Sequence, residues 1–200
     1  IVGAVRTPIG AYKGVFKDIK AHSLGSVVIK EVIRRANVLQ DEVDEVIMGQ
    51  VLTAGSGQNP ARQAAVSASI PISKPAYLVN QVCGSGLRAV ISGYQSIKLG
   101  EIKLVITGGQ ENMSMAPHSI LSRYGKKISK DALVDTMIYD GLIDAFNNYH
   151  MGVTAENVAK KFNISREAQD QFALESQKKT ETAINKNRFE EELIKINQSG

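Results

Sequence analysis

The chain has 200 residues, of which 43% are hydrophobic and 22% are charged, and its formal net charge at pH 7 is +4. This composition is ordinary for a globular chain with one large or two small domains. The Lys and Arg residues are scattered, which argues against the clustered basic surface of a nucleic-acid-binding protein. No apolar run approaches the roughly 20 residues of a membrane-spanning helix. The single cysteine excludes an internal disulfide and fits a reducing compartment, which we expect to be the cytoplasm.

The first part of the chain alternates between predicted strands and helices. Ile1–Val5 is apolar and predicts a strand, and Ser23 is the expected N-cap of the helix that follows. Pro60 suits the first position of a short helix that runs through Val66. The further predicted strands are Glu45–Gly49, Pro75–Val79 and Lys103–Gly109. Such alternation, with nearly continuous apolar strands, predicts an α/β fold whose sheet is covered on both faces.

After Pro117 the pattern changes. From His118 to Tyr149 the apolar periodicity is weak, which is typical of an inserted excursion rather than of the packed layers before it. Two helices then follow. One is predicted from Thr154 to about Phe162, and the other is capped by Ser165 and has Glu167 in its first turn.

Cys83, the only cysteine, lies between the third predicted strand and a helix. That helix is predicted to extend to Gly100 by apolar residues at helical spacing, namely Leu87, Val90, Ile91, Tyr94 and Ile97. A lone cysteine is usually a small inert core residue. Here it would stand at or just before a helix N-terminus, where unpaired N–H groups and the helix dipole stabilise negative charge on sulfur. The glycines on either side of Ser85 permit a tight turn, so the position predicts a nucleophile.

Five segments of the chain, in the same order, resemble motifs of the thiolase family, whose members condense or cleave acyl-coenzyme A thioesters. The segments are Arg6–Gly10, Gly49–Leu52 with Gly57–Gln63, Val79–Ala89, Gly108–Pro117 and His150–Ala159. Five colinear motifs that span nearly the whole chain are far more specific than any one of them.

The resemblance implies a thiolase-like α/β fold, which is a layered α-β-α arrangement with a mixed sheet and an inserted, mostly helical loop domain. Residues 1–116 would form the first of two similar halves, and residues 117–200 an incomplete loop domain that lies over the active site. The second half of the family carries an activating histidine and a second cysteine in motifs that this sequence lacks. We therefore expect the C-terminal half to be absent and the chain to be the front portion of a longer enzyme, or a fragment of it.

The resemblance also implies a reaction. Cys83 would attack an acyl thioester as a thiolate and keep the acyl group, and its backbone N–H would stabilise the oxyanion. His150 with Met151 is similar to the segment that lines the acyl pocket of short-chain members, and Leu142 is the corresponding contact for the pantetheine arm. We expect an acetyl-CoA acetyltransferase that condenses two acetyl-CoA to acetoacetyl-CoA and CoA, reversibly.

Two alternatives stay open, a degradative 3-ketoacyl-CoA thiolase and a catalytically silent, truncated thiolase-like module. Acetyl-CoA and CoA are the expected substrates, so no separate cofactor is predicted, and the excess positive charge suits their phosphates. No metal site is predicted, because His22 and His118 lack the spacing of metal ligands. The complete protein is expected to form a homo-oligomer, either a dimer or a tetramer, with no nucleic-acid or membrane partner.

Overall fold

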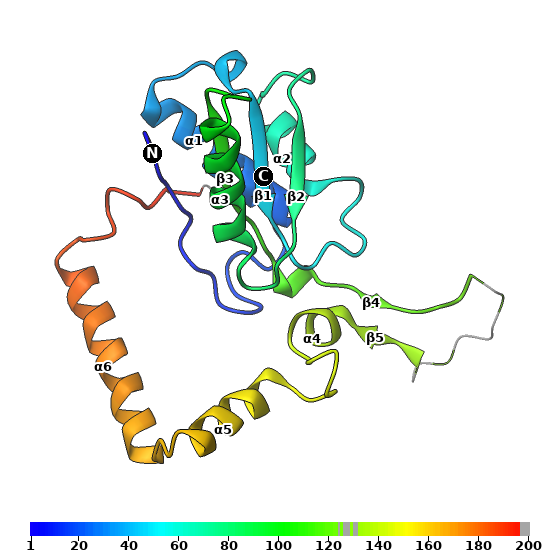
Figure 1. Cartoon of the computed structure of the whole chain (residues 1–200), viewed down its shortest axis with the longest axis vertical. Helices are drawn as coiled ribbons and strands as arrows, with labels where there is room; N and C mark the ends of the chain where they lie inside the picture. The colour runs from blue at the N-terminus through cyan, green and yellow to red at the C-terminus, as the bar shows by residue number, and fades with distance from the viewer. Residues whose placement is uncertain (124, 126–128, 130–131, 197–200) are drawn as a thin grey trace. The chain divides into compact units, whose positions relative to one another are not determined.

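The computed structural model describes residues 1–123, 125, 129 and 132–196 (Figure 1). Its first region contains three parallel strands and the helices that cover them. In chain order its elements are α1 (Ala21–Ala36), the 3₁₀ helix η1 (Gln40–Glu42), β1 (Glu45–Gly49), α2 (Pro60–Ser67), β2 (Ala76–Val79), α3 (Ser85–Lys98) and β3 (Val105–Gly109). The elements that follow are η2 (Met113–Met115), β4 (His118–Ser119), β5 (Val134–Asp135), α4 (Thr136–Gly141), α5 (Met151–Lys161) and α6 (Arg166–Asn185).

The main sheet has the strand order β2-β1-β3, with β1 in the centre. Both pairings are parallel, and the register places Ile47 of β1 between Tyr77 of β2 and Thr107 of β3. The antiparallel direction occurs in a separate pair, in which His118 of β4 lies opposite Asp135 of β5. The two strand directions implied by the resemblance are therefore both present, but in different sheets.

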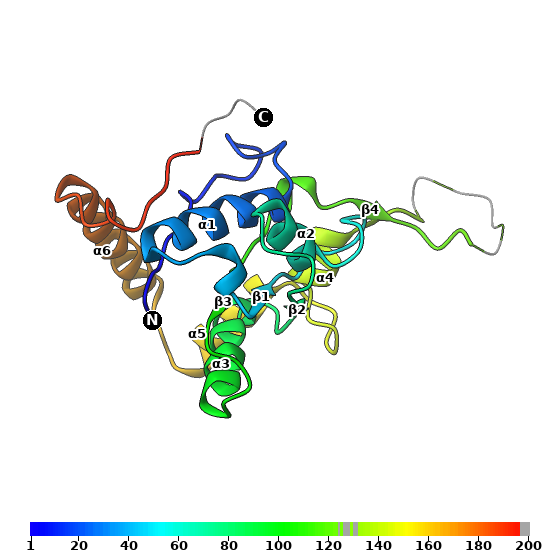
Figure 2. The ribbon, with the colours of Figure 1, turned by 90° about the horizontal axis from the view of Figure 1, so that it is seen from above.

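Helices cover both faces of the main sheet, as the alternating pattern predicted. α1 and α2 lie together on one face and α3 lies on the other (Figure 2). The core between α1, α2 and β1 is largely apolar, although Ser26 of α1 is also buried. Its buried members are Ile29, Ile33, Val43, Val46, Met48, Ala61, Ala64, Ala65, Ala68 and Ile70. The central strand is thus the most buried element, whereas β2, at the edge of the sheet, is half-buried and Tyr77 is exposed. β2 is less buried than its apolar sequence indicates, because an edge strand has a neighbour on only one side.

The face that α3 turns toward the sheet consists of small residues. Ser85, Ala89 and Gly93, which are four residues apart, are buried, whereas Leu87 and Tyr94 are 68% and 62% exposed. A β-carbon on Gly93 would come within 2.6 Å of the Thr107 side chain. The helix therefore packs closely on β3 and leaves its larger apolar side chains on the outer surface.

The strand predicted for Ile1–Val5 does not form. The segment has no regular structure, and the side chains of Ile1 and Val2 are exposed. One backbone hydrogen bond, from the N–H of Ile194 to the carbonyl of Arg6 at 3.0 Å, attaches the segment at its inner end. A segment whose apolar side chains stay exposed and that pairs with no described strand does not offset the entropy lost on ordering it, which explains the difference from the prediction.

Two predicted helix starts were also wrong. α1 begins at Ala21 with Lys20 as its N-cap, so Ser23 lies inside the first turn. α5 begins at Met151 rather than Thr154, because His150 caps it with its side chain. The N-cap of α6 is Ser165, as predicted, and its hydroxyl accepts the N–H of Ala168 at 3.2 Å.

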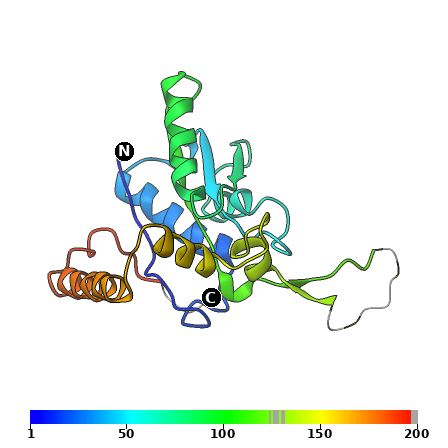
Figure 3. The ribbon, with the colours of Figure 1, turned by 60° about the horizontal axis from the view of Figure 1, so that its bottom comes forward.

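The chain divides into two compact units, of which the second contains residues 142–193. This second unit holds α5 and α6, which are joined by the short turn at residues 162–165 (Figure 3). Neither helix has a buried residue. The first unit holds the sheet and α1 to α4. The predicted division of the chain at residues 116 and 117 stays a prediction. Within the part of the chain that the structure describes, no helix is long and apolar enough to cross a membrane.

Candidate active site

Cys83 lies on a five-residue turn that joins the end of β2 to the start of α3. It directly precedes Gly84, the N-cap residue of α3, and it is exposed. Because β1, β2 and β3 are parallel, the turn lies at the edge of the sheet where all three strands end (Figure 1). Loops at this edge commonly carry the functional residues of α/β proteins.

Hydrogen bonds close the turn around Cys83. The N–H of Gly84 donates to the carbonyl of Gln81 at 3.0 Å, and the N–H of Ser85 donates to the carbonyl of Val82 at 3.1 Å. The side chain of Asn80 accepts the N–H of Val82 at 2.9 Å. Among the hydrogen bonds of the described residues, none uses the N–H of Cys83. That N–H is therefore available to a ligand oxygen near the sulfur.

Three glycines let the start of α3 rest directly on the strand ends. A β-carbon on Gly49 of β1 would lie 2.5 Å from the Ser85 carbonyl carbon and 2.6 Å from the Gly86 nitrogen. A β-carbon on Gly109 of β3 would lie 3.5 Å from the α-carbon of Gly86. The position of the Cys83 turn is therefore determined by close backbone contact with β1 and β3 and does not depend on flexible side chains.

The other predicted site residues lie in the second unit, where the structure brings all three together. The N–H of Met151 donates to the carbonyl of Leu142 at 2.8 Å, and His150 pairs with Ile143 through an antiparallel bridge. The Nδ1 atom of His150 accepts the N–H of Gly152 at 2.9 Å, which caps α5.

This cap determines the tautomer of the neutral imidazole. Because Nδ1 of His150 is an acceptor, the ring proton resides on Nε2, and the ring is exposed. His150 therefore presents an N–H donor at its outer edge. Met151, beside it, is partly exposed and offers an apolar surface. Cys83 belongs to the first unit, whereas Leu142, His150 and Met151 belong to the second.

The sequence did not single out two polar residues that follow β3 and hold the neighbouring loops. The carboxylate of Glu111 accepts the N–H of Val51 at 2.8 Å and that of Leu52 at 3.3 Å. Burial raises the pKa of the Glu111 carboxyl, and the two backbone donors act against that shift. The side chain of Asn112 donates to the carbonyls of Phe16 and Ile19 at 2.8 and 2.6 Å. Both residues closely follow a predicted strand and lie in the segment Gly108–Pro117, which resembles a thiolase motif, so this position could have identified them.

A buried pair of amides lies at the same end of the sheet. Nε2 of Gln110 donates to Oε1 of Gln50 at 2.9 Å, and Nε2 of Gln50 donates to the carbonyl of Leu52, also at 2.9 Å. Both side chains are buried. The pair connects the end of β3 to the loop after β1, which is a structural role.

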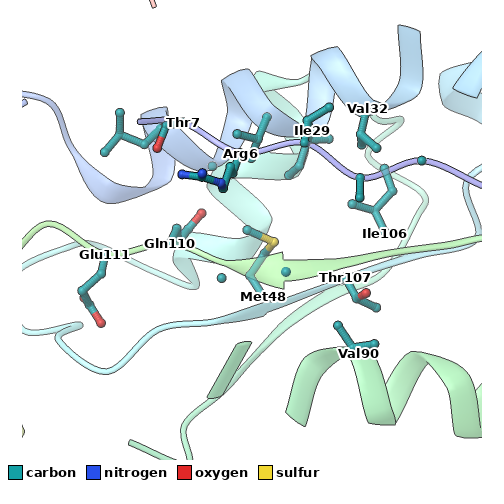
Figure 4. Close-up of a pocket in the computed structure, with 18 of the residues that line it drawn as sticks. Arg6, Thr7, Ile29, Val32, Met48, Val90, Ile106, Thr107, Gln110 and Glu111 are labelled. Atoms are coloured by element: carbon teal, nitrogen blue, oxygen red, sulfur yellow. The ribbon is translucent and has the colours of Figure 1, made fainter. Parts of the chain in front are cut away.

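A cavity of about 360 Å³ separates the N-terminal segment from α1 and β3 (Figure 4). Its walls are largely apolar and include Ile29, Met48 and Ile106, and Gln110 and Glu111 line it as well. Cys83 is not among its lining residues. The cavity therefore does not enclose the predicted nucleophile. Within the described residues, no three His, Cys, Asp or Glu side chains form a group that could hold a metal ion.

Comparisons with known proteins show which family the chain is similar to. The family model described as "Thiolase, N-terminal domain" matches residues 1–200. An acetyl-CoA acetyltransferase of Rhizobium meliloti is 54% identical over 194 residues, which are 97% of this chain and 49% of the relative. The cytosolic acetyl-CoA acetyltransferase of Rattus norvegicus is 51% identical over 199 residues, which are 100% of this chain and 50% of the relative.

A solved structure shows the same fold. A thiolase from Ascaris suum, crystallised in complex with coenzyme A, superimposes with a TM-score of 0.93 at 37% sequence identity and covers 98% of this chain and 51% of its own. The thiolase-like fold class predicted from the sequence is thereby confirmed. The chain spans about half the length of the curated relatives it matches. With a family match over all 200 residues, the chain belongs to the thiolase family, and the matching part of that family is its N-terminal domain.

Proposed function

We propose that this chain supplies the nucleophile of an acetyl-CoA acetyltransferase that condenses two acetyl-CoA into acetoacetyl-CoA and CoA, reversibly. The observation that carries the proposal is the exposed Cys83 thiol on the turn before α3, with an N–H that no other described residue uses. Relatives named acetyl-CoA acetyltransferase, about half identical to this chain, support the choice of substrate.

In the first step, the Cys83 thiolate attacks the carbonyl carbon of acetyl-CoA. The carbon–sulfur bond to coenzyme A breaks, coenzyme A leaves as a thiolate, and the acetyl group remains on Cys83. Negative charge develops on the carbonyl oxygen during this attack. The N–H of Cys83 is a suitable donor for that oxygen because it lies beside the sulfur and is already oriented by the closed turn.

In the second step, a base removes a proton from the methyl group of another acetyl-CoA, and the resulting carbanion attacks the acetyl-cysteine carbonyl. The bond to sulfur breaks and Cys83 leaves as a thiolate, which restores the starting state. The family motifs that carry the activating histidine and the second cysteine are not present in these 200 residues, so this step needs groups from outside them. We assign His150 and Met151 to the acyl pocket and Leu142 to the pantetheine arm.

The proposal extends to the setting of the enzyme. Coenzyme A thioesters are substrates, and we propose no further cofactor. We also propose a cytoplasmic protein that forms a dimer or a tetramer of identical subunits, in line with the relative described as cytosolic. Multi-angle light scattering of the complete protein tests the oligomeric state, and a monomer would contradict this part of the proposal.

The test of the reaction is the intact mass of the protein after incubation with acetyl-CoA, with Cys83→Ala as the control. We expect a gain of one acetyl group in the wild-type protein and none in the variant, because Cys83 is the proposed acyl acceptor and the only cysteine of these 200 residues. Absence of any gain in a folded sample of the complete protein would refute the acyl-cysteine and would favour a catalytically silent module.

A further inference from the structure

The residue before the nucleophile has an unusual backbone conformation. Val82 has a φ of +48°, in the left-handed region, where a β-branched side chain is a genuine outlier. Its side chain is 49% exposed, so burial of that side chain does not compensate for the strain. Strained backbone of this kind persists only where surrounding interactions enforce it.

Ser85 makes the closest of these interactions. Its hydroxyl donates to the carbonyl of Val82 at 2.6 Å and accepts the N–H of Gln81 at 2.8 Å. The hydroxyl thus bridges the two residues that precede Cys83. Ser85 is only 4% exposed, so water cannot readily replace the hydroxyl. The backbone of Ser85 is itself held against Gly49, which ties the bridge to the sheet.

The conformation of Val82 sets the direction of the next residue. A change of φ at Val82 toward the ordinary region would rotate the peptide that carries the Cys83 N–H and would swing the thiol with it. Because a displacement of about 1 Å can cost a hundredfold in rate, such a rotation would be strongly felt in the reaction.

We propose that Ser85 is a positioning residue for Cys83, whose hydroxyl holds Val82 in the left-handed conformation and thereby aims the thiol and its adjacent N–H. The inference rests on the proposed function in one respect, namely that Cys83 is the nucleophile. It adds a residue whose side chain does not contact the substrate but determines the reactivity of one that does.

The test is a double-mutant cycle of Ser85→Ala and Val82→Asn in the complete protein. Asparagine adopts the left-handed region far more readily than valine, so it should hold the conformation without the Ser85 hydroxyl. Ser96→Ala, on the same helix but away from the turn, is the matched control. Two readouts are compared. The first is the rate constant for alkylation of Cys83 by iodoacetamide, followed by mass spectrometry on the peptide that contains Cys83, because the complete protein is expected to carry a second cysteine. The second is the kcat and KM of acetyl transfer from acetyl-CoA.

We expect Ser85→Ala to slow alkylation by about tenfold or more and to lower kcat with KM for acetyl-CoA unchanged. Val82→Asn alone and Ser96→Ala should behave like the wild type. In the Val82→Asn background, Ser85→Ala should change the alkylation rate constant and kcat by no more than about twofold. The difference between the effects of Ser85→Ala in the two backgrounds is the coupling that the cycle measures. A purely structural role of Ser85 would give the same loss in both backgrounds, and that result would overturn the proposal.

Two further outcomes are decisive. If Ser85→Ala does not fold, the double variant must fold and react like Val82→Asn, and its failure to do so would overturn the inference. If the wild-type protein accepts no acetyl group, the proposed function fails, whereas the iodoacetamide cycle still reports on Ser85 alone. The two failures are thus distinguished by the two readouts.

Discussion

Gly49 at the end of β1 lies so close to Ser85 at the start of α3 that a β-carbon on Gly49 would come within 2.5 Å of the Ser85 carbonyl carbon. Any side chain at position 49 would therefore push the first turn of α3 away from the sheet. Since Cys83 lies two residues before Ser85 on the same closed turn, it would move as well. The position of Cys83 thus depends on the absence of a β-carbon at residue 49 of β1.

We accordingly predict that Gly49→Ala lowers the free energy of unfolding by about 1–3 kcal/mol, the usual cost of overpacking a tight interior. It should also slow the alkylation of Cys83. Gly108→Ala on the neighbouring strand is the control, because a β-carbon there would meet only the end of the Met48 side chain, at 3.8 Å from its sulfur and 3.9 Å from its methyl carbon. Urea unfolding and iodoacetamide kinetics measure the two effects. Equal stability of the two variants would show that α3 can shift without cost.

A second prediction concerns Asp44 and the dependence of stability on pH. The Asp44 carboxylate accepts the N–H of Lys103 at 2.7 Å and that of Leu104 at 3.0 Å. The bonds from Leu104 and Lys103 lower the pKa of Asp44 in the folded protein. Because the pKa of Asp44 is lower in the folded protein than in the unfolded chain, the ionised carboxylate stabilises the folded state. This contribution to the free energy of unfolding is complete above the ordinary Asp pKa of about 4 and is lost as the pH falls through the lowered pKa.

Asp44→Ala should therefore reduce the free energy of unfolding at about pH 7, and its difference from the wild type should narrow below about pH 4. Urea unfolding at several pH values measures this. The exposed Asp41, three residues earlier, provides Asp41→Ala as the control, for which no comparable narrowing is expected. A difference between Asp44→Ala and the wild type that stays constant down to about pH 2 would contradict the assignment of the two bonds to the charged carboxylate.

Much of the fold could be predicted from the sequence because local patterns decide it. The apolar run of β1, the proline at the first position of α2 and the Ser165 cap of α6 each specify their element within a few residues. The Cys83 turn belongs to this group, since a strand, a glycine-rich turn and a helix follow one another directly. The five colinear motifs, which include those at Cys83 and His150, then identified the family.

The rest could not be predicted because it depends on packing between distant segments. Apolar periodicity in α3 marked Leu87 and Tyr94, but the sheet contacts Ala89 and Gly93, because small residues let the helix approach closely. A hydrophobic pattern identifies a helix but not the surface that covers each of its faces. Likewise, the hydroxyl of Ser85 gains its importance only when it is buried between two backbone groups.

The exposed side of α3 yields a third prediction. Replacement of both Leu87 and Tyr94 by Gln should reduce concentration-dependent self-association of the 200-residue chain, because contiguous exposed apolar surface promotes association. Far-UV circular dichroism should stay unchanged, since neither side chain is buried. Ala89→Gln, on the buried side of the same helix, should instead lower the free energy of unfolding by about 2–5 kcal/mol. Light scattering over a concentration series measures the self-association. If the double variant scatters as much light as the wild type, the exposed side of α3 does not mediate the association.

The last prediction separates two roles of His150. Its Nδ1 caps α5 by accepting the N–H of Gly152, while its Nε2–H is free to donate to a substrate oxygen. His150→Ala removes both functions and should cost about 1 kcal/mol of stability through loss of the cap. His150→Asn keeps a good N-cap but lacks the outer donor. Both variants of the complete protein should therefore cleave acetoacetyl-CoA about tenfold more slowly, the loss expected from one hydrogen bond worth about 1–1.5 kcal/mol.

Steady-state kinetics with acetoacetyl-CoA, paired with thermal unfolding, measure the two roles independently. If His150→Asn has normal kinetics and His150→Ala is slow, His150 acts only as a helix cap. It would then affect the reaction only by fixing the position of Met151. Normal kinetics in both variants would remove the reason to assign the protein to the short-chain type, because that assignment rests on His150 and Met151. Slow kinetics in both, with stability lost only in His150→Ala, is the result that the Nε2 donor requires.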